Sequence, residues 1–353
     1  MKKVIQLFAI TAASFSSIGI VFADSINATI VAGHPPVFRW VKHLENTFIP
    51  AANNELDGTQ YTFTWSQHYG GSLAKVGSVL EATEEGLAEV GYVSTLFESS
   101  KLPLQNVTYF TPFVSNDVTE ISSLIDSLNH SNKDMINEWH SNGVEYLGGA
   151  TGIDEYLLMT RFPLASMDDL ASKKIAAPGP AVNWLEGTGA IAVSGDLTRY
   201  YNELKAGVYD GVIVFATAAV PSKLYEVAPY ISKVGFGAQY AGSIVANKDW
   251  FDSQPKEVQL ALKSAANAQR IAYHQDLTQA IESSMNLMVE NGAVVSTINS
   301  QFQQSWVNGM DNVALKWAAH LDQQGKAGTQ VLKTYLDTMR ENGVQPARNW
   351  DQE

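Results

Sequence analysis

The alternation of apolar and polar residues in the first third of the chain predicts strands separated by helices. Apolar or alternating runs at Ala28–Ala32, Tyr61–Trp65 and Glu89–Val93 are typical of strands. Between them, Phe38–Phe48 places its apolar residues on one helical face, and a second helical pattern ends at Gly86. Strands that alternate with helices pair in parallel and carry the helices on the faces of the sheet. We therefore expect a βαβαβ unit at the start of the fold.

The middle of the chain continues this pattern and contains the point where the chain leaves the first sheet. Val118–Trp139 has the periodicity of a helical pair, and strands are predicted at Val144–Gly148 and Tyr156–Thr160. The stretch Gly149–Gly152 separates these strands, and we place the crossing into a second part of the fold there. Ser243–Asn247 is expected to be a strand that returns to the first part.

A long helix dominates the last third of the chain. We expect Asp252 or Ser253 to cap it, with Pro255 in its first turn. Its periodicity continues to about Glu290, where an Asn-Gly pair ends it. A helix of this length is unusual in a globular domain. Further helices are predicted over 306–339.

The segment Tyr200–Val227 carries the most specific pattern in the chain. A helix with Leu204 and Val208 on its apolar face leads through a Gly-Val-Tyr-Asp-Gly turn into the apolar strand Val212–Phe215. The two glycines allow a tight turn that residues with a Cβ resist. A second helix follows and ends in Lys-x-x-Glu-Val. Taken alone, this is an αβα unit, and a fold does not specify a function.

The same segment resembles the solute receptors of TRAP transporters, of the dicarboxylate-receptor type. In that family a Y-x-A-L-x-x-G-x-x-D-G segment followed by K-x-x-E-V recurs in the second lobe. The counterparts here are Tyr201, Leu204, Gly207, Asp210, Gly211, Lys223, Glu226 and Val227. The resemblance implies an α/β, periplasmic-binding-protein-like fold. In such a fold two α/β lobes enclose a ligand cleft, and the long helix spans both.

The resemblance also implies a receptor and not an enzyme. Such a receptor captures a small organic solute by closure of its lobes and delivers it to the membrane subunits of a TRAP permease. No cofactor is needed, and we expect a monomer. The chain has no Gly-x-Ser-x-Gly, His-Glu-x-x-His or Walker motif, and its 7 His are scattered without ligand spacing. We therefore expect no catalytic residue and no metal site.

The N-terminus and the composition point to the periplasm. A basic start, the apolar stretch 4–21 and a loosely fitting cleavage site at Val21–Ala23 are typical of a cleaved signal peptide. No later stretch is apolar enough to span a membrane, so we expect the protein not to be membrane-inserted. With 0 Cys, it has no thiolate chemistry and no disulfides. A net charge of -13 disfavours nucleic acid and anionic lipid as partners.

These observations divide the chain into three parts. Residues 1–23 are the signal peptide. The first lobe comprises 24–152 and 242–283. The second lobe, with the C-terminal helices, comprises 153–241 and 284–353.

The residue at one position departs from the family pattern. In these receptors an Arg in a G-x-K-x-R-x-P pattern usually ends a strand of the second lobe and grips the solute carboxylate with two hydrogen bonds. In this chain Ala176 stands at that place. Many relatives have a second Arg after the Gly of the first crossing. Its counterpart here is Asp154, Glu155 or Tyr156, and none of these is basic.

This departure favours a small organic cation or amino alcohol, such as ethanolamine, as the solute. Ala176 removes the reason to bind a carboxylate, and a buried unpaired acid invites a cation. Aromatic faces with one carboxylate are typical of ammonium sites. The residues that we expect to contact the solute are His34, Tyr69, Ser94, Asp154, Glu155, Tyr156, Trp184, Phe215 and Tyr240.

Three alternatives remain open at this point. Arg39 or Lys75 could anchor an organic acid in a non-standard way. The receptor could present its ligand to a membrane sensor and not to a permease. Finally, the sequence does not decide which residue of 154–156 faces the cleft, because a slip of one residue in a strand exchanges its faces.

Overall fold

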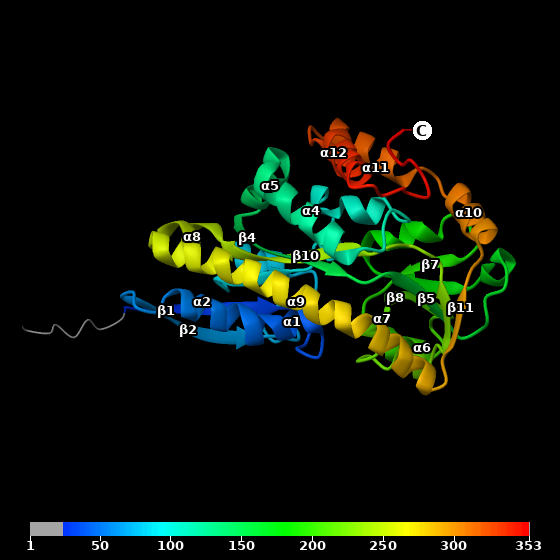
Figure 1. The fold of residues 1–353 in the computed structure, drawn as a ribbon, viewed down its shortest axis with the longest axis horizontal. Helices are drawn as coiled ribbons and strands as arrows, with labels where there is room; N and C mark the ends of the chain where they lie inside the picture. Colours follow the sequence, from blue (N-terminus) through cyan, green and yellow to red (C-terminus); the bar gives the residue numbers. More distant parts are fainter. Residues whose placement is uncertain (1–23, 353) are drawn as a thin grey trace, which may run out of the picture.

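The computed structural model describes residues 24–352, which form two sheets crossed by one long helix (Figure 1). The predicted signal peptide lies outside the described residues. The fold is the predicted α/β type with the long helix in place. The division into lobes at specific residues stays a prediction.

The first sheet has five strands in the order β2-β1-β3-β10-β4. Their bounds are β1 Asp24–Ala32, β2 Tyr61–His68, β3 Val90–Val93, β4 Val144–Ile153 and β10 Gln239–Asn247. Strand β1 runs parallel to β2 and β3, as predicted, whereas β10 is antiparallel to β3 and β4. The sheet is therefore mixed. Strand β10 returns to it from the second sheet and runs opposite to β3 and β4.

The helices of this part differ from the prediction in their bounds. They are α1 Arg39–His43, η1 Leu44–Phe48, α2 Ile49–Glu55, α3 Val79–Glu84, η2 Thr95–Phe97, η3 Leu104–Phe110, α4 Val118–Ser131 and α5 Lys133–Ser141. The first helix continues beyond Phe48, and η1 is a π-helical segment just before Pro50. Proline cannot donate the regular helical hydrogen bond, and a wider turn accommodates it.

The second sheet has six strands in the order β11-β9-β5-β8-β6-β7. Its strands are β5 Tyr156–Thr160, β6 Lys174–Ala177, β7 Ile191–Ser194, β8 Gly211–Phe215, β9 Tyr230–Lys233 and β11 Val294–Thr297. The helices between them are η4 Met167–Leu170, η5 Gly179–Leu185, α6 Tyr200–Lys205, α7 Ala216–Ala219 and η6 Leu224–Glu226.

The Gly-Val-Tyr-Asp-Gly turn connects α6 to β8 and is hydrogen-bonded to the start of β6. Asp210 accepts a hydrogen bond from the Lys174 backbone N–H at 2.8 Å, and its own N–H donates to the Lys174 carbonyl at 2.8 Å. A Cβ on Gly211 would lie 2.7 Å from Thr160 Cγ2. The motif is therefore structural. Leu204 is buried as predicted, but Val208 is 47% exposed, so its placement on the packed face was wrong.

The stretch Gly149–Gly152, predicted as a break, is part of strand β4, and the crossing between the sheets lies at Asp154 and Glu155, between β4 and β5. Strand β4 extends through the glycine-containing stretch to Ile153, with register shifts opposite β10. Glycine permits this path because the backbone packs closely on neighbouring elements. A Cβ on Gly152 would lie 2.6 Å from Val118 Cγ2, and Gly148 (φ 127°) faces Ala266 of the long helix.

The long helix α9 (Lys256–Glu290) contacts β4, α2 and α7, and so runs along both parts of the molecule (yellow in Figure 1). It begins later than predicted, because 248–253 form the separate helix α8 (Lys248–Ser253) and Pro255 stands just before the first turn. Two of its side chains bind one residue of the crossing strand. The Tyr273 hydroxyl donates to the Gly152 carbonyl at 2.8 Å, and the Gly152 N–H donates to His274 Nε2 at 3.2 Å.

The C-terminal helices are α10 Ser300–Gly309, α11 Val313–Gln323 and α12 Gly328–Glu341. Helices α11 and α12 pack on η3, beside the first sheet (Figure 1). Trp350 is fully buried and donates from Nε1 to the Pro112 carbonyl at 2.7 Å. The end of the chain is thereby fixed on the segment between η3 and α4.

The contact of His274 with Gly152 predicts a loss of stability at acid pH. Burial lowers the pKa of His274 from 6.5 to about 4, while its hydrogen bond to the Arg270 carbonyl acts in the opposite direction. The neutral ring therefore stabilises the fold fully above pH 6.5, and this contribution is lost as the pH falls toward 4. The loss amounts to about 3 kcal/mol at most for this residue. Urea unfolding at pH 7 and pH 4.5 should show a smaller difference in His274→Gln than in the wild type. His320→Gln, at an exposed position, serves as control. An equal change in the free energy of unfolding between the two pH values in all three proteins would contradict the prediction.

Candidate functional site

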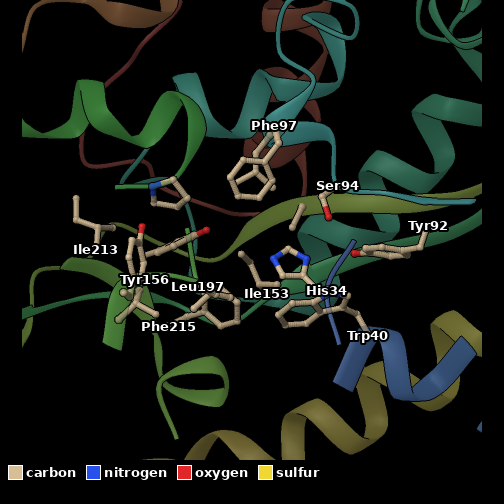
Figure 2. A pocket seen from close by; sticks show the side chains of 15 residues that line it. His34, Trp40, Tyr92, Ser94, Phe97, Ile153, Tyr156, Leu197, Ile213 and Phe215 are labelled. Carbon is tan, nitrogen blue, oxygen red and sulfur yellow. The ribbon is translucent and has the colours of Figure 1, made fainter. Parts of the chain in front are cut away.

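A pocket lies between the two sheets, where strands from both end (Figure 2). It holds about 430 Å³ of space not filled by protein atoms, part of it open to solvent. Its lining comes from β3, β4, β5, β8 and β10, from the helices α1, η2 and α6, and from the turns after β1, β3, β6 and β7. The lining residues are His34, Trp40, Tyr92, Ser94, Leu96, Phe97, Ile153, Tyr156, Pro178, Leu197, Tyr200, Ile213, Val214, Phe215 and Ala241.

Aromatic rings from both parts of the chain form a large share of the wall. Phe38 stacks on Trp40 with ring centroids 4.8 Å apart, and Trp40 lies 5.9 Å from Phe215 on β8. Phe215 in turn meets Tyr156 edge to face at 5.3 Å. This row of rings connects the first helix to the second sheet and leaves an apolar surface facing the pocket.

Two polar atoms of this wall are buried and have no partner within residues 24–352. They are Nε2 of His34 and the hydroxyl of Tyr200. Burial lowers the pKa of His34 to about 4, although the charge of Asp196 acts in the opposite direction. Burial also raises the pKa of Tyr200 well above its usual value. Both groups are therefore uncharged at neutral pH. Ser94 supplies a further hydroxyl to the lining.

None of the residues that line the pocket is Asp, Glu, Lys or Arg. Ala176 lies on β6, fully buried. The two side chains proposed as alternative anchors do not replace the missing Arg. Arg39 binds both carboxylate oxygens of Asp276 at 2.7 Å, and the exposed Lys75 lies outside the lining.

Of the nine residues expected to contact the solute, the lining contains His34, Ser94, Tyr156 and Phe215. Trp184 and Tyr240 belong to the core. Trp184 stacks on Tyr109 at 5.8 Å and donates to its carbonyl, and the Tyr240 hydroxyl bonds to Ser243 at 2.8 Å.

The remaining three predicted residues are also absent from the lining. Tyr69 donates its hydroxyl to Gln67 at 3.1 Å. Glu155 is half-buried, and burial raises its pKa. Asp154 is 2% exposed and accepts hydrogen bonds from the N–H and the hydroxyl of Thr217. Burial raises the pKa of Asp154 to about 6, and the bonds from Thr217 oppose that shift. The carboxylate is therefore paired within the protein and does not face the pocket.

Sequence reasoning missed eleven residues of the lining. Four of them are aromatic, namely Trp40, Tyr92, Phe97 and Tyr200. A usable signal was present for two of these. Tyr92 precedes the end of a strand, where ligands of parallel sheets bind, and Tyr200 opens the motif helix. Trp40 and Phe97 lie on short helices, and the local pattern does not specify which of their faces turns to the pocket.

A two-part α/β protein with an enclosed pocket between its sheets has the architecture of a solute-binding protein. Residues 45–320 match the bacterial extracellular solute-binding protein, family 7, and the chain belongs to that family. It is a TRAP-type periplasmic solute receptor and not an enzyme. Cleavage of its leader stays a prediction. Within residues 24–352, no helix is both long and apolar enough to cross a membrane.

Solved structures support the fold. DctP7, a Bordetella pertussis receptor binding pyroglutamic acid, is 17% identical, with a TM-score of 0.76 over 88% of this chain and 99% of its own. A Rhodoferax ferrireducens TRAP protein in complex with benzoate is 14% identical, with a TM-score of 0.78 over 90% and 98%. The ectoine-binding protein of the Halomonas elongata TeaABC transporter is 18% identical, with a TM-score of 0.74 over 90% and 100%. Curated protein sequences give no match.

The position of Asp154 predicts that its loss affects stability and not solute contact. In Asp154→Asn one acceptor oxygen becomes an N–H₂ group that faces a donor of Thr217. We expect the free energy of unfolding to fall by about 1–3 kcal/mol, with solute affinity unchanged. Thr217→Val removes the hydroxyl partner and should act in the same direction. Affinity lost in Asp154→Asn but kept in Thr217→Val would instead place the carboxylate in the binding site.

Proposed function

We propose that this TRAP receptor captures a small, largely apolar solute that carries no net negative charge. The observation that supports this proposal is an aromatic pocket without a basic side chain in its lining. An ionised carboxylate loses much hydration when it is buried, and it needs a cation or several donors in return. Here the available donors are neutral, and Ala176 stands where the family pattern has its Arg.

The proposed solute differs in charge from the solutes of several similar structures. These structures include receptors of pyroglutamate, galacturonate and benzoate, all of which are carboxylates. The same fold can therefore bind an acid. What separates this chain is the chemistry of its lining. The pocket offers rings, aliphatic side chains and the uncharged polar groups of His34, Tyr92, Ser94, Tyr156 and Tyr200.

A small organic cation or amino alcohol is the second candidate. The row of aromatic faces favours it, because such faces attract ammonium groups. The charge of Asp196 also acts on His34 and on Tyr200, although Asp196 lies outside the lining and is paired with Arg199 at 3.2 Å. This candidate no longer depends on Asp154, which is paired with Thr217. It requires instead that the rings and Asp196 stabilise the ammonium group.

The expected mechanism is closure around the solute followed by delivery to the permease. The pocket is built from both sheets, so a solute in it contacts both parts of the molecule at once. Such contacts stabilise the closed form over the open one. The family works with TRAP permease subunits in the membrane. We propose the same partner here, with the receptor as a monomer.

A thermal-shift series on a constant phenyl group tests the charge of the solute. Benzyl alcohol, benzylamine and benzoate differ mainly in the group attached to the ring. We expect benzyl alcohol to raise the melting temperature by about 5 °C at a hundredfold excess over its Kd. Benzoate should have no effect.

A second pair of nearly equal shape separates the two candidates. Choline and 3,3-dimethyl-1-butanol differ in the charge of the bulky end. Stabilisation by the neutral alcohol supports the first candidate, and stabilisation by choline and benzylamine alone supports the cation. A shift with benzoate alone would overturn the proposal for both classes.

A further inference from the structure

Two residues of the pocket lining, Tyr200 and His34, carry uncharged polar groups without a partner among the described residues. Tyr200 and His34 are 1% and 4% exposed, and their Oη and Nε2 atoms have no partner among the described residues. Buried polar groups are normally hydrogen-bonded, because an unpaired one costs stability. Two such atoms in the wall of one pocket indicate partners that come from a bound molecule.

The ring of Tyr200 is held in place by close packing against Gly195. A Cβ on Gly195 would lie 2.6 Å from Cε1 of Tyr200 and 3.2 Å from the Cβ of Ala176. The phenol ring therefore packs directly on the backbone after β7, next to the small side chain of β6. The Tyr200 N–H also donates to the Asp196 carbonyl at 3.2 Å. These contacts leave the ring little freedom to move its hydroxyl out of the pocket.

His34 is held in a similar way by aromatic edges. Its ring meets Phe38 at 5.5 Å and Trp40 at 5.4 Å, in both cases nearly perpendicular. Figure 2 shows the imidazole among the rings of the pocket wall. Asp196 acts electrostatically on His34 and also on Tyr200, which places both groups near the same turn, although they come from distant parts of the chain.

We propose that Tyr200 and His34 determine which solutes this receptor accepts, by binding an uncharged hydroxyl or carbonyl group of the solute. This inference rests on the function proposed above and names the polar group of that solute. A neutral phenol donates one hydrogen bond and accepts others, and a neutral imidazole has one donor and one acceptor. A hydroxyl group offers the same combination, so it satisfies both protein atoms at once. Tyr200 and His34 are the specificity-determining pair, and the rings hold the apolar remainder of the solute.

The test compares benzyl alcohol with toluene, which lacks only the hydroxyl. Dissociation constants of both probes are measured by titration for the wild type, Tyr200→Phe and His34→Phe. We expect the wild type to prefer the alcohol, and each variant to lose about 3- to 10-fold of that preference. Tyr209→Phe is the matched control, because Tyr209 is buried and close to Tyr200 but lies outside the lining. It should keep the wild-type preference.

A stability measurement separates this role from a structural one. Tyr200→Phe removes an unpaired hydroxyl and keeps the ring, so its urea midpoint should stay at the wild-type value or rise. A fall in that midpoint, or an unchanged preference in Tyr200→Phe and His34→Phe, would overturn the inference. So would a wild type that binds neither probe. The function proposed above fails by a different result, namely stabilisation by benzoate alone in the phenyl series.

Discussion

The two hydrogen bonds between the long helix and Gly152 are the constraint on which the arrangement of both sheets depends. The residue before the crossing gives its carbonyl to Tyr273 and its N–H to His274, and no side chain fits between this strand and its neighbours. Strand β4 therefore leaves the first sheet along a path that α9 determines. The ends of β4 and β5, which carry Ile153 and Tyr156, reach the pocket from that point. The packing that fixes the chain at the crossing therefore also fixes the pocket residues Ile153 and Tyr156.

The net charge of the molecule is not reflected in the composition of its pocket. The chain has a net charge of -13, whereas the pocket lining contains no Asp, Glu, Lys or Arg. Charges close to the site are paired elsewhere. Asp154 binds Thr217, and Arg39 binds Asp276. The side chains that line the pocket are neutral. Discrimination between solutes therefore depends more on the shape of the pocket and on the direction of a few hydrogen bonds than on attraction between charges.

Most of the fold could be predicted from the sequence, because its elements have clear periodicity and recognisable ends. The strands of the first sheet, the long helix and the motif turn at Asp210 are local features of this kind. The path of β4 could not be predicted, since glycines suggested a break where close packing required them in a strand. The site was predicted in part. His34 and Phe215 follow strand ends, where a pocket is expected. The partner of Asp154 is distant in sequence, and only the folded chain shows that Thr217 satisfies it.

The order of strands in the first sheet also has a consequence for folding. Strand β10, which ends at Asn247, lies between β3 and β4. Strand β4 therefore cannot be joined to the rest of the sheet until β10 has been synthesised. The N-terminal part of the nascent chain therefore cannot complete its own core as it emerges. Contacts between segments so far apart in sequence slow folding, because a long loop must close before they form. The emerging receptor is thus kept from its native state until most of its residues are available.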